Sequence, residues 1–405
     1  MSINQSEKQY DMLVVGAGIS GLSMAHYCTQ QGLNTLVLEK QGRNGGLFHS
    51  HQFGSQYNDF WIELGTHSCF NSYGHIIQLI EDYGLFENLI KKQSFSFKLW
   101  TNRQVKSIPS QLNYLELLFS IPRLFFLTKQ DKSIEQYYPK IVGKRNYQNV
   151  FSQAFNGVIC QPSDNFPAEM LFRKKPRRKD VIRNFTFEQG IQKLPEHMAA
   201  TLNVKNNIEV EQIEYDGQMY HVTVNGETYT SRYLTLATPV NITADLTQQI
   251  APDIQQALRG VNHVSIETIG VVLDKQTMNL KPIGGIIGQR DKFYSVVSRD
   301  AVEHPDYRGF TFHFKPSKLN NDEKLDYLCG VLQIDKTLIQ DVITKQNYLP
   351  APVIGHQQTL EKVAAALQDK PLFITGNYFY GVSAEDCVTR SVDEFNRLKS
   401  TLVHS

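Results

Sequence analysis

A glycine-rich turn near the start of the chain constrains the fold more than any other feature. The apolar run from Met12 to Val15 leads into Gly16-Ala-Gly18-Ile-Ser-Gly21, and a helical pattern follows. In this context the spacing is typical of a dinucleotide-binding turn, because glycines allow a tight bend and a close approach to pyrophosphate, which the helix N-terminus attracts. We therefore predict that the dinucleotide contacts Gly16, Gly18, Ile19, Ser20 and Gly21.

A second predicted strand, Thr35 to Leu38, ends at Glu39, 18 residues after Gly21. A carboxylate at this point accepts hydrogen bonds from a ribose 2′-hydroxyl and repels a 2′-phosphate. We therefore expect FAD or NAD rather than NADP. The alternative, an acidic residue on the surface after a strand, receives less weight because the register matches the motif.

The sequence continues Glu39-Lys-Gln-Gly-Arg43-Asn-Gly45-Gly46, and here it resembles the flavin-dependent amine oxidase superfamily, in which an acid is followed by Arg-x-Gly-Gly. The resemblance implies FAD. Arg43 either pairs with phosphate or shapes the loop, and the two glycines let the backbone pass beside an extended cofactor. The residues added to the predicted site on this basis are Lys40, Arg43, Gly45, Gly46 and Leu47.

The end of the chain resembles the C-terminal flavin segment of protoporphyrinogen oxidases, through Gly376-Asn377 and Gly381-Val382-Ser383. The resemblance implies that Gly376 brings a strand end close to the pyrophosphate. Gly381 to Ser383 then start a helix whose amides stabilise negative charge on reduced flavin. It also places Gly65, Thr66 and His67 near the flavin ring, and the backbone of Val210 near adenine. For His67 we favour a hydrogen-bonding or backbone role, and we name no catalytic residue.

The predicted fold is α/β, with a Rossmann-like FAD-binding domain of the amine oxidase or protoporphyrinogen oxidase type and an inserted mixed α+β substrate domain. The FAD-binding domain comprises residues 1–75, 190–260 and 350–405. The substrate domain comprises residues 76–189, expected to be mainly helical, and 261–349, expected to be mainly sheet. Three strands, 207–214, 218–224 and 227–237, are predicted to form a meander joined at Asp216-Gly217 and Asn225-Gly226, dipeptides typical of tight hairpins.

Composition excludes several classes of partner and cofactor. Lys and Arg total 41 against 40 Asp and Glu, so no net field favours nucleic acid. The five cysteines are scattered without CxxC spacing, which predicts reduced thiols, a cytoplasmic protein and no metal site. The polar start of the chain does not resemble a signal peptide. The resemblance places covalently linked flavins in a region that here contains no cysteine, so we expect non-covalent FAD.

Two segments suggest peripheral contact with a membrane. Residues 112–127 are strongly apolar but too short to span a bilayer, and residues 173–179 are almost entirely Lys and Arg. Taken alone, each segment favours an ordinary interpretation, because an apolar stripe usually belongs to a core and a run of charges usually forms a solvated loop. The sequence does not decide between a monomer and a homodimer.

The resemblance favours an oxidase that removes a hydride from a bulky apolar small molecule, as protoporphyrinogen oxidases do. A second glycine cluster, Gly284 to Gly288, lacks the fingerprint spacing, so oxygen or a quinone is the expected electron acceptor. Asn113 stands where some family members carry an arginine that pairs with a substrate carboxylate. The alternatives are an amine or amino-acid-derived secondary-metabolite oxidase, with Tyr378 and Phe379 against substrate, and a non-catalytic module resembling GDP-dissociation inhibitors.

Overall fold

The first sheet contains β1 (Lys8–Val15), whose residues from Met12 to Val15 are all buried. The structure is a computed structural model that describes residues 8–403. The strands lie in the order β10 (Val204–Lys205), β2 (Thr35–Leu38), β1, β13 (Glu227–Leu236), β12 (Tyr220–Val224) and β11 (Gln212–Tyr215), and β19 (Leu372–Ile374) also pairs with β13. The pairs β10–β2, β2–β1, β1–β13 and β13–β19 are parallel. Burial on both faces is expected of such strands when helices cover both sides.

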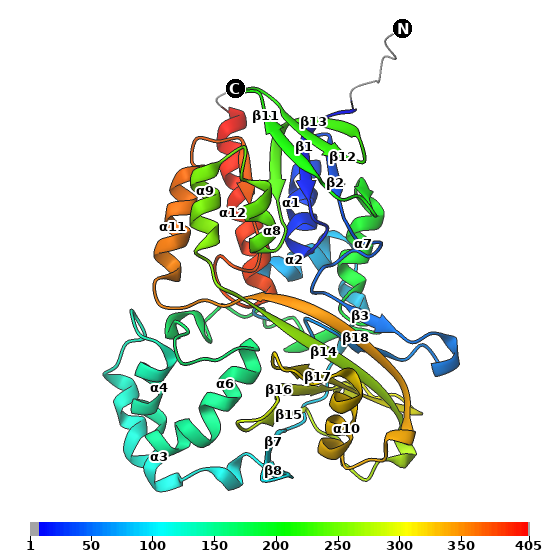
Figure 1. Cartoon of the computed structure of the whole chain (residues 1–405), viewed down its shortest axis with the longest axis vertical. Helices are drawn as coiled ribbons and strands as arrows, with labels where there is room; N and C mark the ends of the chain where they lie inside the picture. Colours follow the sequence, from blue (N-terminus) through cyan, green and yellow to red (C-terminus); the bar gives the residue numbers. More distant parts are fainter. Residues whose placement is uncertain (1–7, 404–405) are drawn as a thin grey trace.

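Helices cover both faces of this sheet and form the upper lobe in Figure 1. Met12 and Val14 pack toward one set of helices, and Leu13 and Val15 pack toward the other, because alternate side chains of a strand point to opposite faces. The first set is α1 (Ile19–Gln30), α2 (Gly74–Asp82), α7 (Lys193–Thr201) and α12 (Ala384–Val403). The second set is α8 (Val240–Leu246), α9 (Pro252–Arg259) and α11 (His356–Leu367).

The predicted meander is present as β11, β12 and β13, although β11 begins five residues later than expected, at Gln212. Asn225 and Gly226 both have positive φ, 49° and 76°, as a tight hairpin turn requires. The α/β fold class is confirmed. The structure also places α2 in the core of this lobe, on α12, whereas the expected boundary at residue 75 assigned it to the other domain. Residues 1–7 and 404–405 of the predicted FAD-binding domain lie outside the described range.

A second sheet forms the lower lobe. Its strands lie in the order β18 (Ile339–Pro350), β14 (His263–Asp274), β17 (Tyr307–Phe314), β16 (Phe293–Ser298), β15 (Gly285–Gly288), β7 (Phe97–Thr101) and β8 (Gln104–Ser107). Only β15 and β7 pair in parallel among the strands of this sheet. Figure 1 shows β14 and β18 running diagonally from the lower lobe toward the upper one. Helix α10 (Asn321–Leu332) packs on this sheet.

The expected helical insertion is less purely helical than predicted, because β7 and β8 join the second sheet. Its helices are α3 (Tyr114–Ser120), α4 (Ile134–Val142), α5 (Lys144–Asn146) and α6 (Ser152–Ile159). Two small sheets complete the structure, β3 (Ser50–Gln52) with β4 (Trp61–Glu63), and β5 (Cys69–Phe70) with β9 (Asn184–Phe187) and β6 (Leu89–Lys91).

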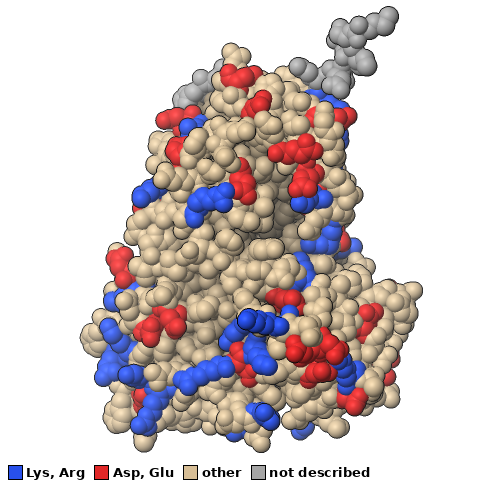
Figure 2. Space-filling view, in the orientation of Figure 1, with Lys and Arg blue, Asp and Glu red and all other residues tan. Residues whose placement is uncertain are grey.

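The surface differs between the lobes. Acidic and basic side chains are interspersed over the upper lobe, whereas basic side chains gather at the lower left, over α3 and α4 (Figure 2). Across residues 8–403, none of the helices has the length and apolar content needed to cross a bilayer.

Candidate functional site

Two cavities meet between the lobes. The first, called here the nucleotide cavity, has a volume of about 670 Å³ and is lined by Val15, Leu38, Ala237 and Gly376. These residues end or follow β1, β2, β13 and β19, so the cavity lies at the carboxyl ends of four parallel strands, where doubly wound α/β sheets bind their ligands. The second, called the apolar cavity, has a volume of about 830 Å³. Both are lined by Leu47, Thr66, Val158, Cys160, Asn347, Leu349, Val382, Ser383 and Ala384.

Each glycine of the first turn has its own steric role. Gly16 has φ +102°, a conformation that favours glycine. A Cβ on Gly21 would lie 1.9 Å from the carbonyl oxygen of Gly16, so α1 packs on the turn only with glycine there. A Cβ on Gly18 would meet only the Cα of Gly46, at 4.0 Å, and would point into otherwise open space.

The N-terminus of α1 faces the nucleotide cavity. No side chain caps this helix, and Gly18, Ile19 and Ser20 line the cavity wall. Uncapped amides at a helix N-terminus attract anions. The second glycine pair, Gly45 and Gly46, also lines the wall, and the amide of Gly45 donates to the carbonyl of Ala17 at 2.8 Å. These residues fit the pyrophosphate of a dinucleotide.

Glu39 directly follows β2 and lines the same cavity. Its Oε2 accepts a hydrogen bond from the amide of Ala17 (2.7 Å), and its Oε1 accepts one from the amide of Gln41 (2.8 Å). The carboxylate is therefore held in a fixed orientation by backbone groups, with further acceptor capacity for ribose hydroxyls. Lys40 and Val210 line the cavity too, and Lys40 forms an exposed ion pair with Glu209.

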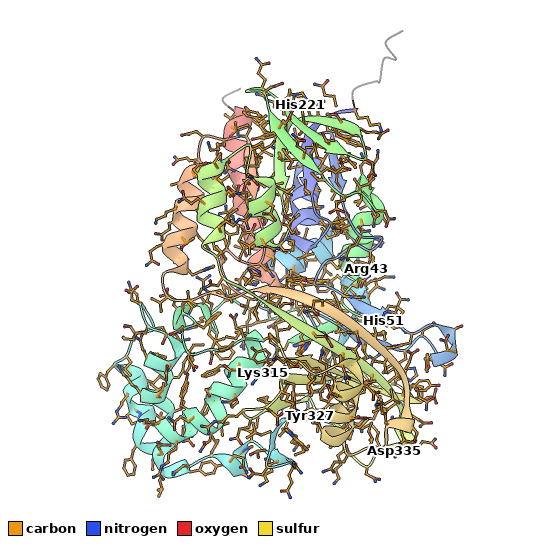
Figure 3. All side chains as sticks on the ribbon, viewed as in Figure 1. Arg43, His51, His221, Lys315, Tyr327 and Asp335 are labelled. Atoms are coloured by element: carbon orange, nitrogen blue, oxygen red, sulfur yellow. The ribbon has the colours of Figure 1, made fainter. Side chains whose placement is uncertain are left out.

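Arg43 shapes the loop around it. Its guanidinium donates to the carbonyl oxygens of Asn44 (2.8 Å), Gly46 (2.7 Å) and Phe48 (2.9 Å). Of the two roles left open by the sequence, this geometry supports loop shaping, because Arg43 lines neither cavity. It lies near the junction of the two lobes (Figure 3).

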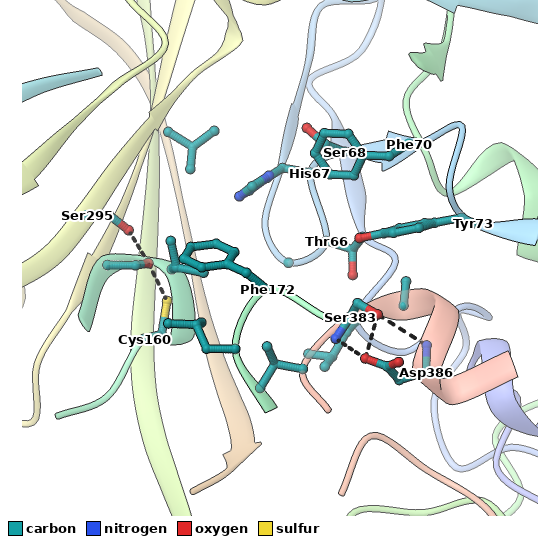
Figure 4. Close-up of a pocket in the computed structure, with 18 of the residues that line it drawn as sticks. Thr66, His67, Ser68, Phe70, Tyr73, Cys160, Phe172, Ser295, Ser383 and Asp386 are labelled. Carbon is teal, nitrogen blue, oxygen red and sulfur yellow. Dashed lines mark hydrogen bonds between the residues drawn. The ribbon is translucent and has the colours of Figure 1, made fainter. Parts of the chain in front are cut away.

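The C-terminal glycine segment closes the nucleotide cavity from the other side. Gly376 and Asn377 line it, and Val382 and Ser383 line both cavities. Ser383 precedes α12, and its Oγ donates to Oδ2 of Asp386 at 2.6 Å (Figure 4). Gly381 lines neither cavity, but a Cβ there would lie 2.6 Å from the same carboxylate oxygen. This glycine therefore allows the turn to close onto Asp386.

The turn after β4 reaches the point where the cavities meet. A Cβ on Gly65 would lie 2.1 Å from the carbonyl oxygen of Leu47, which also accepts a hydrogen bond from the amide of Thr66 (2.8 Å). Thr66 lines both cavities, whereas Gly65 and His67 line the apolar one. Burial lowers the pKa of His67 to about 3, so its imidazole is uncharged at neutral pH.

The walls of the apolar cavity are mostly aromatic and aliphatic (Figure 4). They include Phe70, Tyr73, Phe97, Met170, Leu171, Phe172, Ile266, Ile287, Val297 and Leu349. His313 also lines the cavity, and burial lowers its pKa to about 4. Among residues 8–403, Asp386 is the one carboxylate in this wall, and it forms an ion pair with Lys175 at 2.7 Å. The cavity therefore offers an apolar environment without an unpaired negative charge.

Three arginines line the apolar cavity and are exposed, namely Arg173, Arg177 and Arg183. Among residues 8–403 no ion pair or side-chain hydrogen bond engages their guanidinium groups. They give the cavity a positively charged mouth that can pair with anionic groups of a ligand.

Three predicted substrate residues lie away from both cavities. Asn113 caps α3, where its side chain accepts a hydrogen bond from the amide of Glu116 at 3.0 Å. Tyr378 and Phe379 are only 1% and 2% exposed. The Tyr378 hydroxyl donates to Thr243, and the guanidinium of Arg390 lies 3.9 Å from the centre of the Phe379 ring. Asn113 therefore serves as an exposed helix cap, and Tyr378 and Phe379 pack in the protein interior, so none of the three forms the expected substrate wall.

Two residues that sequence reasoning missed reach the site from β18. Lys345 lines the nucleotide cavity, and its Nζ donates to the carbonyl of Gly46 at 3.3 Å. Burial lowers the pKa of Lys345 to about 7. Asn347, two residues on, lines both cavities and donates to the carbonyl of Leu64 (2.8 Å). The Asn347 Oδ1 atom is buried without a partner among the described residues, so an acceptor is available for a ligand N–H.

Comparison with known proteins agrees with these features. The family described as "Flavin containing amine oxidoreductase" matches residues 19–393. A flavin-containing amine oxidase of Danio rerio is 24% identical over 367 residues, which cover 80% of this chain and 70% of that protein. Among solved structures, a "Putative protoporphyrinogen oxidase" from Exiguobacterium sp. 255-15 has 18% identity and a TM-score of 0.80, covering 98% of this chain and 99% of its own. A fatty acid isomerase from P. acnes has 15% identity and a TM-score of 0.73, with the same coverage.

The two structural likenesses show a shared fold. The match to the family extends over most of the chain, from the first glycine turn into α12. The matched residues include both lobes and both walls of the nucleotide cavity. This cavity fits the flavin dinucleotide. The chain therefore belongs to the flavin-containing amine oxidoreductase family and is an FAD-dependent oxidoreductase.

Proposed function

We propose that this protein is an oxidase that removes a hydride from a bulky apolar substrate bearing an anionic group, in the manner of a protoporphyrinogen oxidase. The observation that carries the proposal is the apolar cavity of about 830 Å³, which meets the nucleotide cavity along a shared wall. A ligand filling it lies next to the residues expected around the flavin ring, including Thr66 and Ser383. Such largely apolar cavities with a few polar groups are typical small-molecule sites.

The flavin supplies the hydride acceptor when bound. The residues of the chain orient the reacting partners and exclude water. Thr66 and Asn347 offer hydrogen-bonding groups where the cavities meet. Ser383 and Ala384, at the start of α12, line the same junction, and the carboxylate of Asp386 in the first turn accepts a hydrogen bond from the Ser383 amide at 3.2 Å. The helix N-terminus favours negative charge at this point. His67 contributes an uncharged imidazole, which does not repel a cation or an anion.

The charges at the mouth favour an acidic substrate over an amine. A protonated amine entering the cavity passes Arg173, Arg177 and Arg183, and the carboxylate of Asp386 is already paired with Lys175. A carboxylate on the substrate pairs with those guanidinium groups instead. The Danio relative is named an amine oxidase, whereas the Exiguobacterium protein carries the protoporphyrinogen oxidase name. An amine or secondary-metabolite oxidase is therefore the alternative proposal.

Oxygen or a quinone remains the proposed electron acceptor. The second glycine cluster forms β15, a strand inside the lower sheet, and its Gly285 packs against Phe97 and Val296. A site for a nicotinamide dinucleotide requires a glycine-rich turn that leads into a helix, and a strand within a sheet does not provide one. The reductant proposed for the flavin is accordingly the substrate itself.

An anaerobic stopped-flow experiment with three probes tests the proposal. Protoporphyrinogen, its dimethyl ester and benzylamine are mixed separately with the holoprotein, and flavin bleaching is followed. We expect the acid to reduce the flavin fastest, the uncharged ester at least about tenfold more slowly, and benzylamine not at all. Arg173→Glu/Arg177→Glu should slow the acid but not the ester. Bleaching by benzylamine alone would overturn the proposal in favour of an amine oxidase.

A further inference from the structure

Helix α3 and the turn that follows it form an apolar surface that faces solvent. This segment, residues 114–126, is called the apolar tip. Phe125 and Phe126 are 82% and 86% exposed, and Ser120 is the single buried residue of α3. The other exposed members are Tyr114, Leu115, Leu118, Phe119, Ile121 and Leu124. A helix that packs on a core buries its apolar stripe, whereas this one leaves its large apolar side chains outside.

The apolar tip is surrounded by positive charge. Arg123, Lys129, Lys132, Lys140, Lys144 and Arg145 are called the basic belt. No acidic residue occurs from Leu117 to Gln130, and only two exposed acidic residues, Asp131 and Glu135, lie among the six basic ones of the belt. Glu116 turns inward, and its carboxylate accepts hydrogen bonds from the amides of Arg145 and Asn146, each at 3.0 Å.

Contacts place the belt beside the tip. Arg123 donates to the carbonyl of Lys140, which brings the end of α4 next to the tip. The basic side chains at the lower left of Figure 2 gather over this part of the molecule.

The same side of the molecule carries the mouth of the apolar cavity. Nζ of Lys129, three residues after the tip, donates to the carbonyl of Leu171 at 2.9 Å. Leu171 and Phe172 both line the cavity, and Phe172 is 61% exposed (Figure 4). Arg173 follows directly and begins the cationic run that ends at Lys179. Lys129 of the basic belt therefore joins the segment after the tip to the wall of the apolar cavity.

We propose that the apolar tip inserts into the surface of an anionic lipid bilayer, with the basic belt on the phospholipid headgroups. Aromatic and leucine side chains ringed by Lys and Arg are the features of an interfacial membrane segment, which buries its apolar face at the boundary of headgroups and acyl chains. When the protein docks in this way, the mouth of the apolar cavity lies at the membrane. An apolar substrate can then enter the cavity from the bilayer. The docking itself does not depend on the proposed reaction.

Charge argues against a second copy of this chain as the occupant. A symmetric dimer through the tip places the same patch on both partners. Each basic belt then faces its own copy, and its six Lys and Arg outnumber the two exposed acidic residues that lie among them, Asp131 and Glu135. An anionic bilayer complements both the apolar and the charged parts of the surface.

Vesicle sedimentation of the holoprotein, without substrate, tests the proposal. We expect binding to phosphatidylcholine vesicles containing phosphatidylglycerol, weaker binding to pure phosphatidylcholine, and a loss of binding as salt increases. Phe125→Ser/Phe126→Ser should lower the partition coefficient at least about tenfold. Val403→Ser, at a side chain 81% exposed at the end of α12, is the matched control and should bind normally.

Charge reversal separates the two contributions. Lys140→Glu/Lys144→Glu should weaken binding to the anionic vesicles and leave binding to pure phosphatidylcholine unchanged. Lys362→Glu/Lys399→Glu, on exposed positions of the upper lobe, should affect neither. Equal sedimentation of wild type and Phe125→Ser/Phe126→Ser would overturn the proposal. So would a dimer in analytical ultracentrifugation that the same double variant dissociates, because it would identify a second copy as the occupant. Flavin reduction is not measured, so failure of the proposed oxidation leaves this test intact.

Discussion

Replacing Gly18 with valine separates cofactor binding from folding. Gly18 has φ −71° and ψ 172°, which any residue adopts without strain. The added Cβ meets only the Cα of Gly46, at 4.0 Å, so the side chain has room in the folded protein. That room is the nucleotide cavity, and the two methyl groups of valine occupy space beside the N-terminus of α1.

The expected size of the effect follows from the contacts that valine blocks. A hydrogen bond from a backbone amide to a charged phosphate contributes about 1.5–3 kcal/mol, so losing one weakens FAD binding about 10- to 150-fold. Stability without FAD should fall by no more than about 1–2 kcal/mol, since the substitution creates no clash and its main cost is a less favourable N-cap for α1.

Titration of FAD into the deflavinated protein measures the affinity, and urea unfolding of the same preparation measures the stability. Gly330→Val is the matched control, because Gly330 lies in α10 with nothing within 4 Å of its added Cβ and lines neither cavity. Wild-type FAD affinity in Gly18→Val would refute the assignment of this turn to the pyrophosphate. A collapse of stability would refute the steric reading of Gly18.

Three further predictions concern folding and pH. Gly21→Ala should prevent folding, because its Cβ would lie 1.9 Å from the carbonyl oxygen of Gly16, and soluble yield compared with Gly330→Ala checks this. Burial raises the pKa of Glu63 from its ordinary value of 4.5 to about 7. Between these two pH values the Glu63 carboxyl is protonated in the folded protein and ionised in the unfolded chain. The free energy of unfolding should therefore be highest at low pH and should decrease by about 3 kcal/mol as the pH rises from 4.5 to about 7. Urea unfolding of the wild type should show this decrease, and Glu63→Gln should lack it. Because the pKa of Lys345 is lowered to about 7, its positive charge disappears as the pH rises through neutrality. FAD affinity should therefore decrease from about pH 6 to about pH 8 in the wild type and stay constant in Lys345→Met, and a pH-independent wild type would contradict the placement of this lysine.

The nucleotide-binding half could be predicted because its signals are local. The turn from Gly16 to Gly21 and the hairpin at Asn225-Gly226 are fixed by backbone requirements that a few neighbouring residues reveal. The second half depends on pairing between distant segments. Strand β7 joins β15, nearly two hundred residues further along the chain, and no local pattern announces such a partner.

The same reason explains the errors at the site. Tyr378 and Phe379 lie next to the flavin segment in the sequence, yet Thr243 and Arg390 provide buried partners that draw both rings into the core. Lys345 looked like an ordinary polar residue of an alternating strand. It reaches the cavity because β18 crosses from the lower lobe to the upper one (Figure 1).

The most direct test of this account is an anaerobic visible spectrum of the purified protein before and after addition of protoporphyrinogen, followed by heat denaturation and identification of the released cofactor. We expect about one FAD per chain, which the substrate bleaches and heating releases into the supernatant, because the nucleotide cavity holds it without a covalent bond. Absence of flavin would contradict the cofactor site, and FAD that stays oxidised would contradict the proposed substrate class while leaving the cofactor site intact.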